Sequence, residues 1–276
     1  MNARPLTLMA VHAHPDDEAS TTGGVLARYA AEGVRTVLVT CTDGGCGDGP
    51  NGTKWGEPGH DPVEVARIRR AELAESCAIL GVGDLELLGY SDSGMIGWAS
   101  NEAPGAFWAT PVEDAARRLA ALFEKYRPDV VVTYDGNGFY GHPDHIQAHR
   151  ITMAAVDLAD AGVAPAKVYE ITVPFSTMRT FAARMRENGA DWEETDDQPE
   201  IGLPDEAIST WVDARAFAEH KYRALAAHAS QPEIDAFLKL GMDTFTELLG
   251  TETFLRVRHT RGDSVDRETD LFAGLR

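Results

Sequence analysis

Residues 6–20 read LTLMAVHAHPDDEAS, and this stretch decides the class of fold. Leu6 to Val11 is a short run that is apolar except for Thr7, which is typical of a strand buried in a parallel sheet. The segment that follows it, HAHPDDEAS, is mostly polar. The sequence therefore predicts a buried strand that ends near Val11, with polar residues at its carboxyl end.

The chain continues as an alternation of strands and helices as far as residue 172. The expected strands are 36–40, 85–88, 129–134 and 167–172, and the expected helices are 24–31, 63–80, 112–126 and 146–158. Strands that alternate with helices predict right-handed βαβ units. The expected fold class is α/β, with a Rossmann-like, mostly parallel sheet and helices on both faces. In such sheets, ligands bind outside the carboxyl ends of the strands.

We expect a single domain over residues 1–276, with long active-site loops. Insertions interrupt the alternation near residues 44–60, 95–110 and 184–204. Loops this long in a compact domain are usually functional or disordered. Trp98 and Trp108, in the second insertion, could cover an apolar part of a substrate, or could simply pack within their own loop.

The balance of charge excludes several classes of partner. Lys and Arg number 25 against 44 Asp and Glu, which gives a formal net charge of −19. Such a surface repels phosphate backbones and anionic lipid, so we expect no nucleic-acid partner and no stable membrane association. The N-terminal apolar run is too short for a signal peptide, and the three cysteines lack a paired CxxC spacing. These features predict a cytoplasmic protein.

A glycine pattern at residues 47–52 resembles a dinucleotide fingerprint. Gly47, Gly49 and Gly52 match GxGxxG after a predicted strand. That fingerprint requires a helix to begin at its last glycine, because the pyrophosphate binds at the helix N-terminus. The sequence TKWGEPG follows instead and cannot begin a helix, so we expect no nicotinamide cofactor.

Two polar clusters follow predicted strands and carry the candidate chemistry. HAHPDDE covers residues 12–18, YGHPDHIQAH covers residues 140–149, and together they contain five of the nine histidines. The carboxyl ends of parallel strands lie at one edge of a sheet, so both clusters can line one crevice. Neutral imidazoles with a carboxylate suit a catalytic divalent metal that keeps one position for water.

The spacing within each cluster supports a shared site. His14 and Asp17 are three residues apart, as are His142 and His145, and such pairs face the same way on the first turn of a helix. Asp16 cannot point in the same direction as its neighbour Asp17. One of these acids can therefore bind the metal while the other acts on water.

Two other classes of function remain open at this point. His14 and Asp16 also form an HxD pattern, which with a distant histidine could build the facial triad of a non-haem Fe(II) oxygenase. Those triads usually occur in double-sheet β folds, unlike this alternation of strands and helices. A non-catalytic sugar-binding module is the other alternative, although it would not need an acid such as Asp16 beside a metal.

The HPDDE stretch at 14–18, together with GHPDH at 141–145, resembles the PIG-L/LmbE family of zinc-dependent N-deacetylases of N-acetylglucosaminyl compounds. RRAEL at 69–73, SDSGM at 91–95 and HASQ at 228–231 are similar to segments of actinobacterial members, which include the deacetylase of mycothiol biosynthesis. The run from Pro5 to Pro50 and the loop 101–108 look closer to deacetylases of teicoplanin-type glycopeptide biosynthesis.

The resemblance implies one Zn²⁺ per chain, although other divalent metals also suit such a site. His14, Asp17 and His145 would hold the zinc ion. Asp16 would be the general base that acts on the hydrolytic water.

The resemblance also assigns roles around the metal. His142 would stabilise the tetrahedral oxyanion or protonate the leaving amine, with Asp144 tuning it. Tyr140 would help to polarise the acetyl carbonyl. Arg69 and Asp92 match positions that contact the sugar or its aglycone in members of the family.

The expected partner is a small glycosylated substrate that bears N-acetylglucosamine. A glycopeptide antibiotic pseudoaglycone is the first expectation, because of the resemblance of the loops. The mycothiol precursor GlcNAc-inositol is the second, and amide cleavage of mycothiol S-conjugates is the third.

Overall fold

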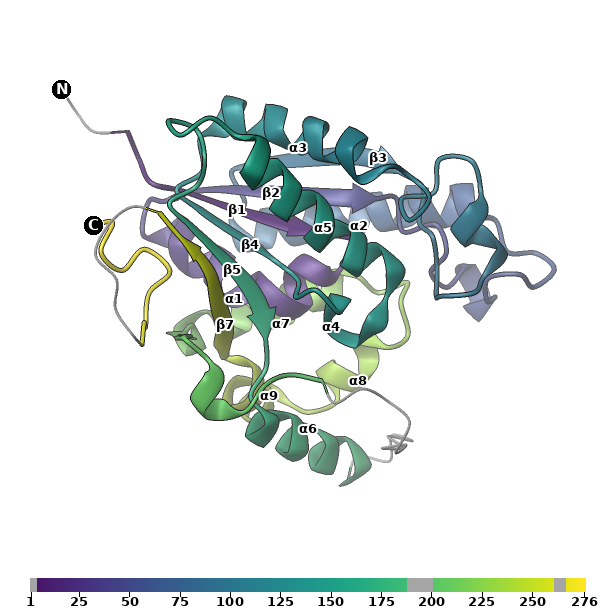
Figure 1. Ribbon diagram of the computed structural model, residues 1–276. Coiled ribbons are helices and arrows are strands. Elements are labelled where there is room, and N and C mark those ends of the chain that lie inside the picture. The colour runs from purple at the N-terminus through teal and green to yellow at the C-terminus, as the bar shows by residue number, and fades with distance from the viewer. Residues whose placement is uncertain (1–3, 188–200, 261–266) are drawn as a thin grey trace.

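The computed structural model describes residues 4–187, 201–260 and 267–276, within which a seven-stranded sheet has helices on both faces (Figure 1). The strand order is β3-β2-β1-β4-β5-β7-β6. The strands are β1 (Thr7–His12), β2 (Arg35–Thr42), β3 (Asp84–Tyr90), β4 (Val130–Thr133), β5 (Lys167–Thr172), β6 (Thr210–Asp213) and β7 (Thr251–His259).

The helices lie between and after these strands. They are α1 (Asp17–Ala31), α2 (Pro62–Leu80), α3 (Val112–Tyr126), α4 (Gly138–Gly141), α5 (Pro143–Leu158), α6 (Phe175–Glu187), α7 (Ala218–Ala227), α8 (Ile234–Leu238) and α9 (Met242–Leu249). In Figure 1, α3 and α5 cover one face of the sheet and α1 and α7 the other, while α6, α8 and α9 gather beyond the end of β5. No helix in the described ranges has both the length and the apolar character needed to cross a membrane.

The order of the strands creates a crevice beside β1. β1 pairs in parallel with β2 on one side and with β4 on the other. The chain first adds β2 and β3 on one side of β1, and then returns to add β4 and β5 on the other side. Such a reversal of strand order is where open α/β sheets bind ligands. Every residue of β1 is buried. The β1 strand therefore anchors the crevice rigidly from within the core.

The predicted fold class is confirmed, with differences at the helix starts. The expected bounds 112–126 and 167–172 match α3 and β5. However, α1 begins at Asp17 and α5 at Pro143, earlier than the expected 24 and 146. Proline fits the first position of a helix, and carboxylates in a first turn interact favourably with the helix dipole. The polar clusters are therefore helix starts rather than loops that precede helices.

The C-terminal third contains elements that the alternation did not predict. β7 runs antiparallel to both β5 and β6, so the sheet is mixed but mostly parallel, as expected. The insertions at 44–60 and 95–110 are irregular apart from short 3₁₀ turns. Of the third insertion, residues 184–187 belong to α6, and 188–200 lie outside the described residues.

A buried ion pair ties the C-terminal segment to the sheet. Lys167 Nζ lies 2.5 Å from Glu268 Oε1, and both side chains are fully buried. Glu268 also accepts a hydrogen bond from the Tyr169 hydroxyl at 2.6 Å and pairs with Arg256 at 2.7 Å. Removing one of these partners would leave a buried charge uncompensated, which lowers the stability of the fold.

Lys167→Met is expected to lower the free energy of unfolding by about 3 kcal/mol, because it removes one partner of a buried ion pair. Urea denaturation measures this loss. The control is Arg117→Met, which breaks an exposed pair with Asp114 and should change stability by less than about 1 kcal/mol. Equal effects of the two substitutions would contradict a structural role for the buried pair.

Candidate active site

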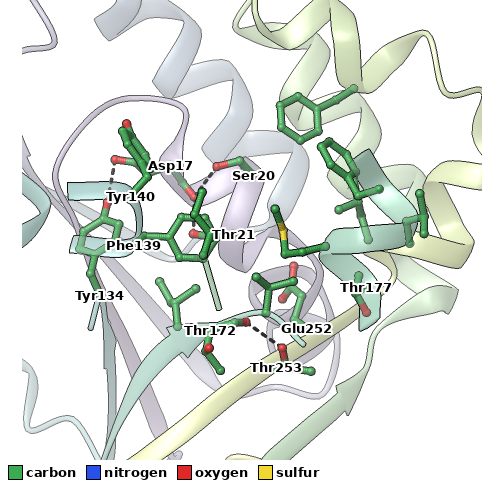
Figure 2. A pocket seen from close by; sticks show the side chains of 18 of the residues that line it. Asp17, Ser20, Thr21, Tyr134, Phe139, Tyr140, Thr172, Thr177, Glu252 and Thr253 are labelled. Atoms are coloured by element: carbon green, nitrogen blue, oxygen red, sulfur yellow. Dashed lines mark hydrogen bonds between the residues drawn. The ribbon is translucent and has the colours of Figure 1, made fainter. Parts of the chain in front are cut away.

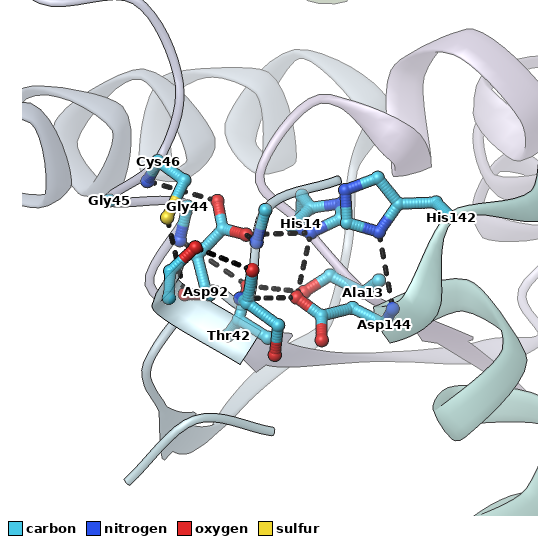
Figure 3. A network of polar contacts seen from close by, with 12 residues as sticks. Ala13, His14, Thr42, Gly44, Gly45, Cys46, Asp92, His142 and Asp144 are labelled. Atoms are coloured by element: carbon cyan, nitrogen blue, oxygen red, sulfur yellow. Dashed lines mark hydrogen bonds and ion pairs between the residues drawn. The ribbon is translucent and has the colours of Figure 1, made fainter. Parts of the chain in front are cut away.

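Both polar clusters meet where β1 and β4 end side by side. β1 ends at His12 and β4 at Thr133, and the two strands are paired in parallel. The chain after β1 enters α1, and the chain after β4 reaches α5, so the first turns of two helices meet above the strand ends. Figure 3 shows His14, from the first cluster, beside His142 and Asp144, from the second.

His14, Asp17 and His145 have the geometry of a tetrahedral metal site. His145 Nε2 lies 3.3 Å from His14 Nδ1 and 3.5 Å from Asp17 Oδ2, and His14 Nδ1 lies 3.4 Å from Asp17 Oδ2. Ligands at about 2.0–2.2 Å from a tetrahedral zinc ion stand roughly 3.3–3.6 Å apart. The three atoms therefore fit a single zinc ion, and His142 offers a further ring nitrogen nearby, in a group with His14 and His145 whose ligand atoms lie within 4.8 Å of one another.

Neighbouring groups hold these three side chains, although His145 Nδ1 is buried without a hydrogen-bond partner among the described residues. His14 Nε2 lies 3.3 Å from Asp144 Oδ2 and 3.5 Å from Asp92 Oδ1. Tyr134 donates a 2.7 Å hydrogen bond to Asp17 Oδ2, and its ring stacks on that of His145 with centroids 4.1 Å apart. Carboxylates behind a ligating imidazole fix its orientation and tautomer. The three candidate ligands are thus preorganised by the protein.

Burial keeps the imidazole of His145 neutral, and the neutral form is the one that binds a metal ion. Burial lowers the pKa of the His145 imidazole to about 4. A neutral ring nitrogen is the species that binds a metal ion.

Asp16 occupies a strained backbone conformation beside the three candidate metal ligands. Its φ of 108° lies in the left-handed region, where residues other than glycine are rare. Arg69 holds the segment by donating to Asp16 Oδ2 at 2.8 Å and to the Pro15 carbonyl at 2.6 Å. Burial raises the pKa of Asp16 to about 6, although the Arg69 guanidinium opposes this rise. Asp16 is therefore a carboxylate with a fixed direction and a raised proton affinity.

Glu18 holds the same strained segment from within the core. Its Oε2 accepts the Asp16 backbone N–H at 3.0 Å, and its Oε1 accepts the Ser76 hydroxyl at 2.5 Å. His228 Nε2 also contacts Glu18 Oε1, at 2.7 Å. Glu18, Ser76 and His228 are completely buried. This network connects α1, α2 and the end of α7 directly behind Asp16.

His142 is oriented as a hydrogen-bond donor. Its Nδ1 accepts the backbone N–H of Asp144 at 3.1 Å at the start of α5. A neutral imidazole that accepts at Nδ1 carries its proton on Nε2. Burial, reinforced by nearby His14 and His145, lowers the pKa of His142 to about 2. The expected tuning of His142 by Asp144 thus involves the backbone, because the Asp144 carboxylate contacts His14 and the Ser93 N–H instead.

A cavity of about 410 Å³ opens beside the candidate metal site (Figure 2). Asp16, Asp17, His145 and Tyr140 form one end of it. The Tyr140 ring lies 5.0 Å from that of His145, centroid to centroid. The opposite walls come from the ends of β5 and β7 and from α6, α8 and α9. The cavity thus joins the first cluster to parts of the chain that the sequence did not associate with a site.

The four residues expected to contact substrate lie outside this cavity. Arg69 and Asp92 are buried behind the site, where Arg69 pairs with Asp16 and Asp92 faces His14. Trp98 stacks on Trp55 with ring centroids 6.5 Å apart, and Trp108 lies under the guanidinium of Arg150 at 4.9 Å. None of the four is among the described residues that line the cavity. The structure therefore places Arg69 and Asp92 behind the site, and it places both tryptophans outside the cavity, with Trp98 against the other long loop and Trp108 against α5.

Sequence reasoning missed the supporting residues. Glu18 lies within the HPDDE motif, Tyr134 ends an expected strand and His228 begins the HASQ segment, but their positions in the sequence do not indicate their roles. Tyr134 could have been singled out because a tyrosine that directly follows a buried strand must find a partner for its hydroxyl. Ser76 gives no such signal, since its partner is far away in the sequence.

Comparison with known proteins decides the family. Residues 9–156 match the family model described as PIG-L, GlcNAc-PI de-N-acetylase. A 1D-myo-inositol 2-acetamido-2-deoxy-alpha-D-glucopyranoside deacetylase from Acidothermus cellulolyticus is 42% identical over 98% of this chain and 95% of its own length. The chain belongs to the PIG-L family. This PIG-L protein is a deacetylase, a hydrolase that acts on an amide, and metal dependence is typical of its family.

Solved structures share the fold at lower identity. A 4-carboxy-2-hydroxymuconate hydratase from Pseudomonas putida superposes with a TM-score of 0.61 at 18% identity, covering 94% of this chain and 99% of its own. A deacetylase of teicoplanin biosynthesis gives a TM-score of 0.57 at 16% identity, covering 91% and 97%. These likenesses show the fold alone. The expected closeness to the teicoplanin-type enzymes is therefore not confirmed in sequence.

Removing one candidate ligand should remove the metal. His145→Ala is expected to reduce bound zinc to below about one tenth of an equivalent, because two remaining ligands cannot hold a tetrahedral ion tightly. Metal analysis of the purified variant after dialysis measures this. His220→Ala replaces an exposed histidine and serves as the control. Stoichiometric zinc in His145→Ala would refute the ligand assignment.

The role of Glu18 can be separated from that of the metal ligands. Glu18→Ala is expected to lower kcat by about tenfold to a hundredfold, because it releases the backbone that directs Asp16. Zinc content should not change, and Glu18→Gln should recover part of the rate. Steady-state kinetics with metal analysis check both points, and Glu75→Ala, at an exposed glutamate of α2, is the control. Loss of zinc in parallel with kcat would argue against this role.

Proposed function

We propose that this protein removes the acetyl group from the N-acetylglucosamine moiety of a small glycoside, with a zinc ion held by His14, Asp17 and His145. The observation that carries the proposal is the triangle of ligand atoms, 3.3–3.5 Å on each side, with Asp16 next to it. The alternatives of an Fe(II) oxygenase and of a non-catalytic sugar-binding module have no support from the deacetylase family to which the chain belongs.

GlcNAc-inositol, the mycothiol precursor, is the substrate that we favour over a glycopeptide pseudoaglycone. The relatives from Acidothermus cellulolyticus and Geodermatophilus obscurus, both 42% identical, are named as deacetylases of this inositol glycoside. The teicoplanin deacetylase shares only 16% identity with this chain, so it is much weaker evidence for the substrate.

The chain's own residues account for proton movement in the hydrolysis. A bound zinc ion supplies Lewis acidity to the water and to the acetyl oxygen. Asp16, directed by Arg69 and Glu18, accepts the proton of the attacking water. His142, which is neutral, donates a hydrogen bond from Nε2 to the developing oxyanion, and the proton that Asp16 has accepted passes to the departing amine. Tyr140 stands at the cavity end of the site, where its hydroxyl can reach the acetyl oxygen.

Asp16→Ala is expected to lower kcat by about 10²-fold or more while zinc is retained, because a positioned base contributes about 10²–10⁴-fold. Amine release, followed with an amine-reactive fluorophore, gives the rate, and metal analysis gives the zinc content. Near-normal activity in the purified variant would show that another group is the base.

The substrate is tested by incubating the zinc-loaded protein with GlcNAc-inositol, a glycopeptide pseudoaglycone bearing N-acetylglucosamine, and a mycothiol S-conjugate. Mass spectrometry should show loss of an acetyl group from the inositol glycoside first. Cleavage of the pseudoaglycone alone would replace our substrate assignment. No cleavage of any of the three would overturn the proposed function.

A further inference from the structure

Tyr140 lies in α4, a short segment whose backbone is strained. Phe139, the residue before it, has φ 66° and ψ −66°. These angles are close to those of the rare γ-turn with positive φ, a conformation that is unfavourable for a residue with a bulky side chain. Strained residues cluster at functional sites and persist only where the surrounding structure fixes them. The strain at Phe139 therefore requires a group that stabilises it.

Asp135 is the group that holds this turn. Its Oδ1 accepts the backbone N–H of Asn137 at 3.0 Å and that of Phe139 at 2.8 Å. Its backbone carbonyl accepts the N–H of Gly138 at 3.0 Å. Three successive N–H groups thus donate to one residue, and a carboxylate forms stronger hydrogen bonds of this kind than a neutral acceptor does. Asp135 therefore stabilises the conformation that is unfavourable for Phe139.

The turn is also fixed at both ends to α5. His149 donates from Nδ1 to the Tyr134 carbonyl at 3.0 Å, directly before Asp135. Gly138 packs so closely on α5 that a Cβ atom added to it would lie 2.7 Å from the backbone nitrogen of Ile146. Because these contacts hold the flanks of the turn, the conformation within it determines the direction of the side chain that follows.

This turn directs Tyr140 toward the imidazoles of the candidate metal site. The Tyr140 ring meets that of His145 edge to face, with centroids 5.0 Å apart, and its centroid lies 6.0 Å from that of His142. Phe139 and Tyr140 both line the cavity, together with Asp17 (Figure 2). Tyr140 is 43% exposed, so few side-chain contacts fix its ring, and its direction depends on the backbone of the turn.

We propose that Asp135 is a positioning residue for the hydrolysis, which holds the strained turn at Phe139 so that the Tyr140 hydroxyl faces the acetyl oxygen. The inference rests on the proposed function, because it requires Tyr140 to contact the acetyl group. Asp135 is not among the described residues that line the cavity, so it acts through Tyr140 rather than on the substrate. The direction matters because a small misplacement of a catalytic group costs much of its effect on rate.

Asp135→Ala is expected to lower kcat by about tenfold without changing the zinc content, because it releases the turn. Asp135→Asn keeps an oxygen acceptor and should recover most of the rate. Amine release from GlcNAc-inositol gives kcat, and metal analysis gives the zinc content. The matched control is Asp61→Ala, which should leave kcat unchanged. Asp61 also accepts two backbone N–H groups, those of Val63 and Glu64, but at the exposed start of α2.

A double-mutant cycle separates positioning from a merely structural role. In the Tyr140→Phe background, which lacks the hydroxyl, Asp135→Ala should lower kcat by less than about twofold. An equal loss of kcat in both backgrounds would overturn the proposal. Loss of zinc in Asp135→Ala, or an Asp135→Asn variant no more active than Asp135→Ala, would also overturn it.

Amide hydrogen exchange, followed by NMR, tests the same contacts without turnover. The N–H groups of Asn137 and Phe139 should exchange at least about tenfold faster in Asp135→Ala than in the unaltered protein. If no substrate is deacetylated, this measurement still decides whether Asp135 holds the turn, so failure of the proposed function and failure of this proposal are distinguishable. Unchanged exchange in Asp135→Ala would overturn the proposal even where deacetylation is confirmed.

Discussion

Four carboxylates, those of Asp16, Asp17, Asp92 and Asp144, are gathered around His14 at the ends of β1 and β4. Like charges at this density repel one another, so the site exists only because compensating groups surround it. Arg69 neutralises Asp16, and the imidazole of His14 lies within 3.3–3.5 Å of carboxylate oxygens from the other three acids. A divalent cation would complete this compensation, which explains physically why an arrangement so rich in acids is tolerated in a buried crevice.

The groups that compensate these charges also give Asp16 and Asp17 different orientations. Asp17 is fixed by Tyr134 and faces the two imidazoles, while Asp16 is turned away by its left-handed backbone. Asp16 precedes the first residue of α1, and its left-handed φ gives its side chain a direction that a helical residue there would not have, so this strain belongs to the site. Arg69 and Glu18 hold that strain from opposite sides, through the side chain and through the backbone N–H.

The C-terminal third supplies a different kind of constraint. Its helices α6, α8 and α9 form their own small hydrophobic cluster, and one surface of that cluster faces the catalytic crevice. The candidate catalytic groups and most of the cavity walls therefore lie on different parts of the chain: the former follow β1 and β4, and the latter lie around the ends of β5 and β7. This division would let the reacting groups stay in place while the shape of the cavity varies.

The sequence by itself determined the α/β sheet, its crevice at β1, the family and the gathering of His14, Asp17 and His145. It could do so because burial patterns are local, and because parallel strand ends must share one edge. Only the tertiary structure decided that Arg69 and Glu18 direct Asp16, that the Asp144 carboxylate contacts His14 rather than His142, and that α6, α8 and α9 wall the cavity. These contacts join residues distant in the chain, so their distances depend on how the helices pack and have no counterpart in spacing along the sequence.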